Sequence, residues 1–411
     1  MGAFSIFTDK KKKKKYSGVP TVEEYYLKLA RRTTFAKFIC IMLIASFALF
    51  AFSNYKDELT IENFRYMLKF VDFGAETVQE TASVVYFDSD TTNKGELLRG
   101  DLAVLNTSGI MVYDFNGDRL YKSDFKYDHP KMISNNKDMI VCDIGGYGLK
   151  IFSSYSTIYT EEFSYPIYGL DACESGGFLV LSSVEGFRSA FFVYDEFYRV
   201  VYSSSFGDKY IDCASLSTNG KEVVAMLHYS RDGDLITLLA KYSVDNQDSS
   251  IFQKEFIDEM PLKINYMADG AYAVLTNKAL RFFSSDNIVT GEIFFEEKSL
   301  LGYEFSNNYA IITYNTIGLS AGTELDVYTK DASLVAVRNF EGALLDKRVS
   351  SDTLFVLSHG LLTTVDLKGV NADKTDEVEN EFRQLLLDQS GLILLSDNKA
   401  EYFKKNDTTI N

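Results

Sequence analysis

Three histidines and one serine motif have residue types that suggest catalytic or metal chemistry. His129, His228 and His359 are far apart in the chain, and the sequence contains no His-x-x-x-His or Cys-x-x-Cys pair. The segment Gly318-Leu-Ser-Ala-Gly322 has the spacing of a hydrolase nucleophile elbow, which needs a strand-to-helix turn followed by an Asp and a His. Here it separates two strand-like runs, and only one His follows it. We therefore interpret it as a hairpin turn.

Three further segments have the composition of ligand-binding loops but lack the rest of the pattern. Gly145-Gly-Tyr-Gly148 is glycine-rich, yet no helix pattern follows it to supply an anion-binding N-terminus. Asp88–Asn93 and Asp114–Asp118 offer oxygen ligands without the distal Glu of a calcium loop. The sequence therefore assigns no catalytic residue, metal site or cofactor, although a site assembled in space stays open.

The four cysteines do not form a disulfide framework. Cys40 lies in an apolar segment, which leaves an odd number, three, in the remainder of the chain. Cys173 and Cys213 each precede an apolar run, so we expect them at equivalent positions of a repeat as buried free thiols. A Cys173–Cys213 bridge is the alternative.

The residues above are distributed over a repeated unit that begins with a short apolar run. Successive runs start 37 to 49 residues apart, which is the period of propeller blades. The runs are too short for helices and rich in branched or aromatic residues, so they are predicted to be buried strands. They occupy residues 101–106, 138–143, 177–182, 222–227, 271–276, 309–314, 353–358 and 391–396.

Each unit has room for four strands, which predicts an all-β, eight-bladed β-propeller over residues 83–405. Seven blades are the alternative, because residues 368–381 are almost entirely polar and could form a loop. The last unit lacks an outer strand, and residues 83–87 form a spare strand ahead of the first unit. We expect this strand to pair with residues 401–404 and close the ring, which removes exposed sheet edges.

The N-terminal part of the chain predicts a membrane anchor. Residues 1–32 form a basic tail with a short helix that starts at a capping box, Thr21-Val-Glu-Glu24. Residues 33–53 are long and apolar enough for a single transmembrane helix. Residues 54–82 form a juxtamembrane stalk helix and linker, and residues 406–411 a C-terminal tail. A cleaved signal peptide would need small residues where Phe47 to Phe52 are bulky.

The charge distribution predicts the orientation of this anchor. Lys and Arg cluster before the apolar segment, whereas acidic residues dominate after it and give the whole chain a net charge of −16. The positive-inside rule then places the N-terminus in the cytoplasm and the propeller outside the cell membrane. An acidic body is also a poor partner for nucleic acid. We expect contact with anionic lipid from one run of residues: Lys10, Lys11, Lys12, Lys13, Lys14 and Lys15.

Several phrases resemble an uncharacterised family of membrane-anchored propeller proteins from Gram-positive bacteria. These phrases are Leu59–Arg65, Gly100–Leu105, Val112–Gly117 and Asp143–Tyr147. The resemblance implies a propeller and a location at the membrane, and it supplies no catalytic residue. More distantly, the repeats resemble WD40 and quinoprotein propellers. The latter place a Trp in each blade, and the absence of Trp here argues against quinone binding.

Together these features predict a single-pass membrane protein whose extracytoplasmic propeller is a binding or scaffold module. The expected partner is an envelope protein or a cell-wall glycan, by analogy with other propellers. The alternative is a glycan hydrolase or lyase with carboxylates at the central channel, for which a pair about 5–10 Å apart would be required.

Overall fold

The computed structural model describes residues 22–54, 84–114, 116–135, 137–246, 250–296, 298–316, 322–388 and 391–404. The chain divides into two compact units, residues 1–69 and 70–411, which we treat separately. The predicted basic contacts Lys10–Lys15, the stalk helix and the C-terminal tail lie outside the described residues.

The described part of the first unit is a helix, α1 (Val22–Asn54). It covers both the short helix predicted before residue 33 and the predicted span at 33–53. The Thr33 and Thr34 hydroxyls donate to the Ala30 carbonyl at 2.9 and 2.8 Å, so their polar groups are satisfied within the helix. Among the residues that the structure describes, no helix combines the length and apolarity that crossing a membrane requires.

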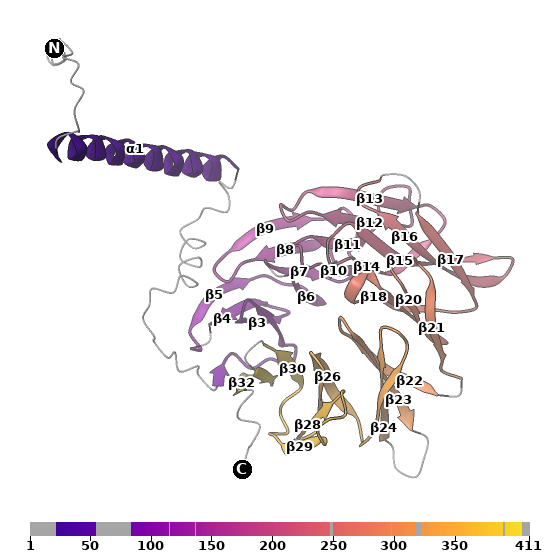
Figure 1. Ribbon diagram of the computed structural model, residues 1–411. Coiled ribbons are helices and arrows are strands. Elements are labelled where there is room, and N and C mark those ends of the chain that lie inside the picture. Colours follow the sequence, from indigo (N-terminus) through magenta and orange to yellow (C-terminus); the bar gives the residue numbers. More distant parts are fainter. Residues whose placement is uncertain are drawn as a thin grey trace. The chain divides into compact units, whose positions relative to one another are not determined.

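The second unit consists of eight four-stranded antiparallel sheets that follow one another around a ring (Figure 1). The first four blades, each with its strands in order from the axis outward, have the following bounds. Blade 1 contains β2 (Lys94–Leu98), β3 (Asp101–Asn106), β4 (Gly109–Tyr113) and β5 (Arg119–Asp124). Blade 2 contains β6 (Pro130–Ser134), β7 (Met139–Asp143), β8 (Gly148–Phe152) and β9 (Thr157–Glu162). Blade 3 contains β10 (Gly169–Ala172), β11 (Phe178–Ser182), β12 (Ser189–Tyr194) and β13 (Val200–Phe206). Blade 4 contains β14 (Tyr210–Leu216), β15 (Glu222–Arg231), β16 (Asp234–Ser243) and β17 (Phe252–Ile257).

The other four blades continue the same order. Blade 5 contains β18 (Pro261–Tyr266), the 3-10 helix η1 (Ala268–Gly270), β19 (Tyr272–Thr276), β20 (Ala279–Phe283) and β21 (Val289–Phe294). Blade 6 contains β22 (Ser299–Phe305), β23 (Tyr309–Thr316), β24 (Gly322–Thr329) and β25 (Leu334–Glu341). Blade 7 contains β26 (Leu344–Ser350), β27 (Thr353–Ser358), β28 (Leu361–Asp366) and β29 (Lys374–Glu377). Blade 8 contains β30 (Gln384–Leu387), β31 (Gly391–Leu395), β32 (Lys399–Lys404) and β1 (Val84–Tyr86).

The apolar runs of the sequence are the second strands of the blades, as predicted. Every residue of β3, β11 and β19 is buried, because each of these strands packs against a neighbouring blade on both faces. Outer strands such as β21 instead alternate between more and less exposed residues. The core is therefore a series of apolar layers between blades, for example the cluster that joins Leu102 and Val104 of blade 1 to Ile393 and Leu395 of blade 8.

The predicted ring closure and blade number are confirmed. The outer strand β1 pairs antiparallel with β32, with Val84 opposite Glu401, Val85 opposite Ala400 and Tyr86 opposite Lys399. The strand β32 starts two residues earlier than predicted. The seven-blade alternative is wrong, because the polar segment 368–381 includes the strand β29. An outer strand pairs with only one neighbour and can therefore be polar.

Consecutive antiparallel strands place the connections alternately at two ends of each blade. We call upper the face that holds the connections from second to third strands and from one blade to the next. The lower face holds the connections from first to second and from third to fourth strands. The chain enters β1 and leaves β32 at the lower face.

Candidate functional site

The residues that the sequence analysis examined for chemistry do not converge on one site. His129 precedes β6, His228 lies in β15, and His359 follows β27. The backbone N–H of His129 donates to Asp143, whereas the His228 ring lies 2.6 Å from the Asp212 carboxylate through Nδ1. Residues 318–321 of the serine motif lie outside the described residues. They join β23 to β24, which pair antiparallel, so the prediction of a connection between two strands is confirmed.

The glycine-rich and acidic segments form turns. Gly145 has a φ of +85°, which favours glycine, and β8 follows directly as a strand. Asp114 Oδ1 accepts hydrogen bonds from the backbone N–H groups of Asn116 and Asp118, both at 2.9 Å. Asp90 Oδ1 likewise accepts from the Thr92 backbone at 2.8 Å. These carboxylates therefore stabilise turns by side-chain acceptance of backbone donors.

The cysteine interpretation is correct in part. All four thiols are free, so the Cys173–Cys213 bridge does not form. The two residues are also not equivalent: Cys173 follows the innermost strand of its blade, whereas Cys213 lies within β14 and is only partly buried. Burial raises the pKa of the Cys142 and Cys213 thiols to about 12, which keeps both protonated and unreactive.

The central channel contains a polar cavity that the sequence analysis did not locate. Its volume is about 510 Å³, and it is lined by innermost strands of six blades. Glu96, Asp171, Glu304 and Arg348 contribute its charged groups. The Arg348 guanidinium lies 2.5 Å from Glu304 and 3.8 Å from Asp346. Burial is the largest effect on Glu96 and Glu304 and raises the pKa of both carboxyls, while Arg348 opposes the rise.

The channel side chains also join neighbouring innermost strands. The Gln384 amide bonds to both the N–H and the carbonyl of Gly95, at 2.8 and 2.9 Å. Asp346 Oδ2 accepts from the Leu385 backbone at 2.8 Å, and Asp171 Oδ2 from the Leu216 backbone at 2.8 Å. Glu96 and Glu304 both line the cavity in which a glycan-cleaving enzyme would place its carboxylates. Arg348, however, forms an ion pair with Glu304. This arrangement stabilises the ring and does not by itself form an acid–base pair.

Arg348→Met should therefore lower the melting temperature at neutral pH and recover part of the loss in acid. Without the guanidinium, Glu96, Glu304 and Asp346 repel one another in the channel. A carboxyl whose folded-state pKa is raised destabilises the fold as pH rises above its unfolded pKa, so acid relieves the defect. Thermal unfolding at about pH 5 and about pH 7.5 measures the effect. Arg199→Met, which breaks the exposed Arg199–Asp195 pair, is the control; an equal, pH-independent loss in both variants would contradict the role of Arg348.

The strongest candidate for a binding site is a set of exposed apolar side chains on the upper face of blades 2–6. Each boundary between successive blades contributes two of them. One lies in an upper connection or at the end of an outermost strand, and the other at the beginning of the next innermost strand. The pairs are Tyr147 with Tyr168, Phe187 with Tyr210, Ile257 with Met260, and Phe294 with Leu301, with exposed fractions between 45 and 57%. We call these eight residues the apolar arc.

Four residues of the apolar arc differ from other exposed apolar residues because they lie at or beside the starts of innermost strands: Tyr168, Tyr210, Met260 and Leu301. Exposed residues on the lower face, such as Phe197, Val200 and Ile288, belong to connections leading to outermost strands or to the starts of those strands. In the arc, the innermost strand of blade 6 has a β-bulge between Leu300 and Gly302, which places Leu301 in the bulge. Bulges redirect side chains in this way next to functional sites.

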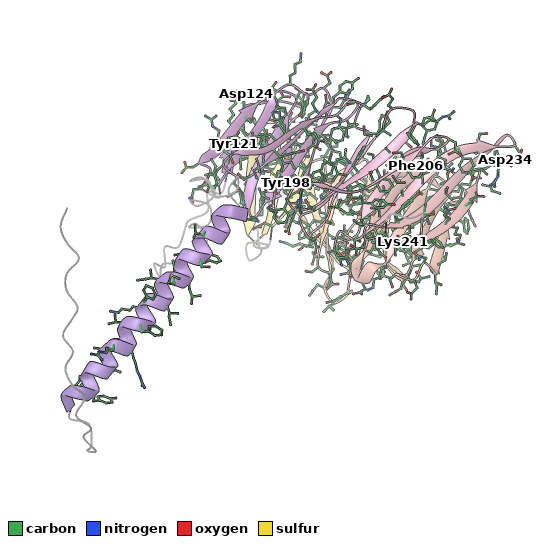
Figure 2. All side chains as sticks on the ribbon, turned by 90° about the horizontal axis from the view of Figure 1, so that it is seen from above. Tyr121, Asp124, Tyr198, Phe206, Asp234 and Lys241 are labelled. Carbon is green, nitrogen blue, oxygen red and sulfur yellow. The ribbon has the colours of Figure 1, made fainter. Side chains whose placement is uncertain are left out.

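Local contacts hold the arc residues in place. The Ile167 N–H donates to Gly146 and its carbonyl accepts from Gly145, both at 2.8 Å, which ties together the connections of Tyr147 and Tyr168. The Tyr210 ring stacks on His228 with centroids 5.3 Å apart, and the Arg188 guanidinium lies 5.2 Å from the same ring. Beside them the β15–β16 hairpin extends to Asp234 at its tip (Figure 2).

Sequence reasoning missed the arc because its members lie in different blades and share no motif. Their convergence on one face depends on strand order.

Comparison with solved structures shows the propeller fold. The Saccharomyces cerevisiae Sqt1 crystal structure is 10% identical, with a TM-score of 0.56 and coverage of 78% of this chain and 98% of that chain. The Dos1 propeller is 11% identical, with a TM-score of 0.55 and coverage of 78% and 94%. The C-terminal WD40 domain of Sif2 is 10% identical, with a TM-score of 0.54 and coverage of 78% and 98%. Identities this low are evidence for the fold alone.

Comparison of sequences identifies the family. No curated protein matches the chain. A family model matches residues 73–404, which include the whole propeller, and its description is a family of unknown function. The resemblance to an uncharacterised propeller family is thereby confirmed, and the chain belongs to the DUF5711 family.

Proposed function

We propose that this chain is a membrane-anchored binding module whose propeller holds an envelope partner through the apolar arc. The observation that carries the proposal is the arc itself. Isolated exposed apolar residues are ordinary on soluble proteins, whereas the arc places a pair of them at each of four successive blade boundaries on one face, as an interaction surface would. Backbone hydrogen bonds hold the connections that carry Tyr147 and Tyr168, so little backbone conformational entropy is lost there on binding, which favours affinity.

The membrane anchor is supported by α1 and by the sequence around it. Residues 38–55 carry no charged side chain, and an uncharged segment of this length can span a membrane. Within α1, large apolar residues such as Phe38, Ile41, Leu43 and Phe47 are all exposed. Their sequence positions distribute them around the helix, so the apolar surface is not a single stripe. Lipid would cover such a helix, with the basic residues before it on the cytoplasmic side.

Photo-crosslinking in intact cells tests the proposed function with a matched pair of positions. Phe187 and Phe197 lie in blade 3, on the upper and lower face respectively, with exposed fractions of 47 and 39%. A benzoylphenylalanine in place of Phe187 should form one dominant adduct in the carbonate-resistant membrane fraction, and the same group in place of Phe197 should not. Equal adducts from both positions, or none from Phe187, would contradict binding by the arc.

A further inference from the structure

We infer that the apolar arc recognises a cationic polypeptide segment that carries apolar side chains between its Lys or Arg residues. The inference rests on the proposed function and specifies the chemistry of the partner. Three observations lead to it: the charges around the arc, the contacts that its rings already make, and its mixture of aromatic and aliphatic residues.

Several cations around the arc are engaged in ion pairs, although the exposed Arg188 and Lys278 form none with any residue that the structure describes. Lys209 pairs with Asp208 at 3.0 Å, Arg231 with Glu255 at 2.7 Å, and Lys298 with Glu324 at 2.5 Å. Exposed acidic residues alternate with the arc residues in the chain, and they make no ion pair with any residue that the structure describes. These are Glu185, Asp232, Asp258 and Glu296. The surface therefore has negative charge left for a partner's cations.

The rings of the arc and of its surroundings already bind cations within the molecule. Arg188 lies 5.2 Å from the Tyr210 ring, and Lys209 lies 5.2 Å from the ring of Tyr229, which neighbours the arc on β15. At the other end, Lys298 lies 4.6 Å from the Tyr314 ring. Such distances are those of cation–π contacts, which strengthen when a partner excludes water. Tyr147 and Tyr168 offer further ring faces to an incoming Lys or Arg.

The aromatic and aliphatic residues of the arc favour a polypeptide over a glycan. Blades 2–4 supply the aromatic residues Tyr147, Tyr168, Phe187 and Tyr210, which suit either a sugar or a side chain. The other four residues include Phe294, but Ile257, Met260 and Leu301 present aliphatic groups, which offer hydroxyl-rich sugars no hydrogen bond. Leu, Ile or aromatic side chains of a peptide would bury against them. An anionic wall polymer would be repelled by the free carboxylates.

The test uses the full-length chain in detergent and fluorescent peptides as probes. The cationic probe repeats Lys-Leu-Lys-Phe, the acidic probe replaces each Lys with Glu, and chitohexaose represents a neutral glycan. We expect anisotropy to show binding of the cationic probe alone, weakened when salt is raised from about 0.1 to about 0.5 M because the Debye length shortens. Tyr168→Ala with Tyr210→Ala should weaken it roughly tenfold or more, and Asp258→Asn with Glu296→Gln roughly threefold or more.

Matched lower-face variants are the controls. Ile288→Ala with Val335→Ala removes exposed apolar groups there, and Asp286→Asn with Asp331→Asn removes exposed charges; neither should alter binding. The cationic inference is overturned if the acidic probe or chitohexaose binds as well as the cationic probe, or if only the lower-face variants matter. The proposed function fails separately, when the Phe187 crosslinking position yields no partner in cells. If the cationic probe binds every variant equally, it is attracted only by the overall negative charge of the propeller. This result also overturns the inference.

Discussion

Val85→Asp should unfold the propeller or lower its melting temperature by tens of degrees, whereas Tyr86→Asp on the same strand should change it little. Val85 is 1% exposed and packs in the cluster shared by blades 1 and 8, while Tyr86 is 70% exposed. A charge at position 85 would be buried without a partner, at a cost of several kcal/mol. Whole domains are stable by only about 5–15 kcal/mol.

Both variants place Asp in β1 and therefore change its strand propensity in the same way. The difference between them reports the buried contacts that close the ring. Thermal and urea unfolding of the full chain measure the difference. Deleting Val84–Tyr86 should reproduce the Val85→Asp result, since Ala400 of β32 would lose its cover. A deletion variant with the stability of the native chain would show that the ring does not depend on this strand pair.

Arg281→Met should destabilise the propeller by about 3–5 kcal/mol, the usual cost of leaving one member of a buried ion pair alone. Arg281 is 4% exposed and donates to both Glu259 oxygens at 2.7 Å. Its guanidinium also lies 4.4 Å from the Phe256 ring. Because Glu259 precedes Met260, this pair also anchors the connection that carries one residue of the apolar arc.

The pH dependence of this defect has a defined sign. Burial favours the neutral Glu259 carboxyl, but hydrogen bonds from Arg281 and Thr276 outweigh it and lower the pKa of Glu259 in the native protein. A lowered pKa contributes stability above the unfolded value, and this contribution is lost as pH falls through the folded value. Without Arg281 the hydrogen bond from Thr276 remains, but the strongest opposition to burial is lost, so the variant should approach the native protein in acid. Glu292→Gln, at the more exposed partner of Arg281, is the control and should cost about 1 kcal/mol or less.

The fold could be predicted in detail from the sequence because the packing of successive blades requires a buried apolar strand at a regular interval. Eight buried second strands appear as eight apolar runs, and the spare strand before residue 87 has no role except closure. The polar strand β29 was harder to predict, since an outer strand needs neither an apolar run nor two neighbours. The misplacement of Cys213 has a similar cause: innermost strands mix polar and apolar residues and vary in length.

The candidate site could not be predicted in the same way. Tyr168, Tyr210 and Met260 are distant in sequence and share no motif, and only the antiparallel order of the strands brings them to one face. The channel charges are equally hard to predict, because charged residues such as Glu96 and Arg348 could as well be solvated. The partner of Arg348, Glu304, comes from another blade, as does Gln384, the partner of Gly95. The residues of the candidate site are distributed over several repeats, so no short stretch of sequence marks the site.

The position of β1 has a mechanical consequence. The chain that precedes Val84 joins the propeller through its shortest strand, which is held to β32 by three residue pairs. Any tension between a fixed N-terminal segment and a partner bound to the upper face must pass through this short ladder. Peeling it away would break the ring before any other blade is loaded. The β1–β32 pair, where the N-terminal segment attaches, is thus also the place at which a pulling force would open the propeller ring.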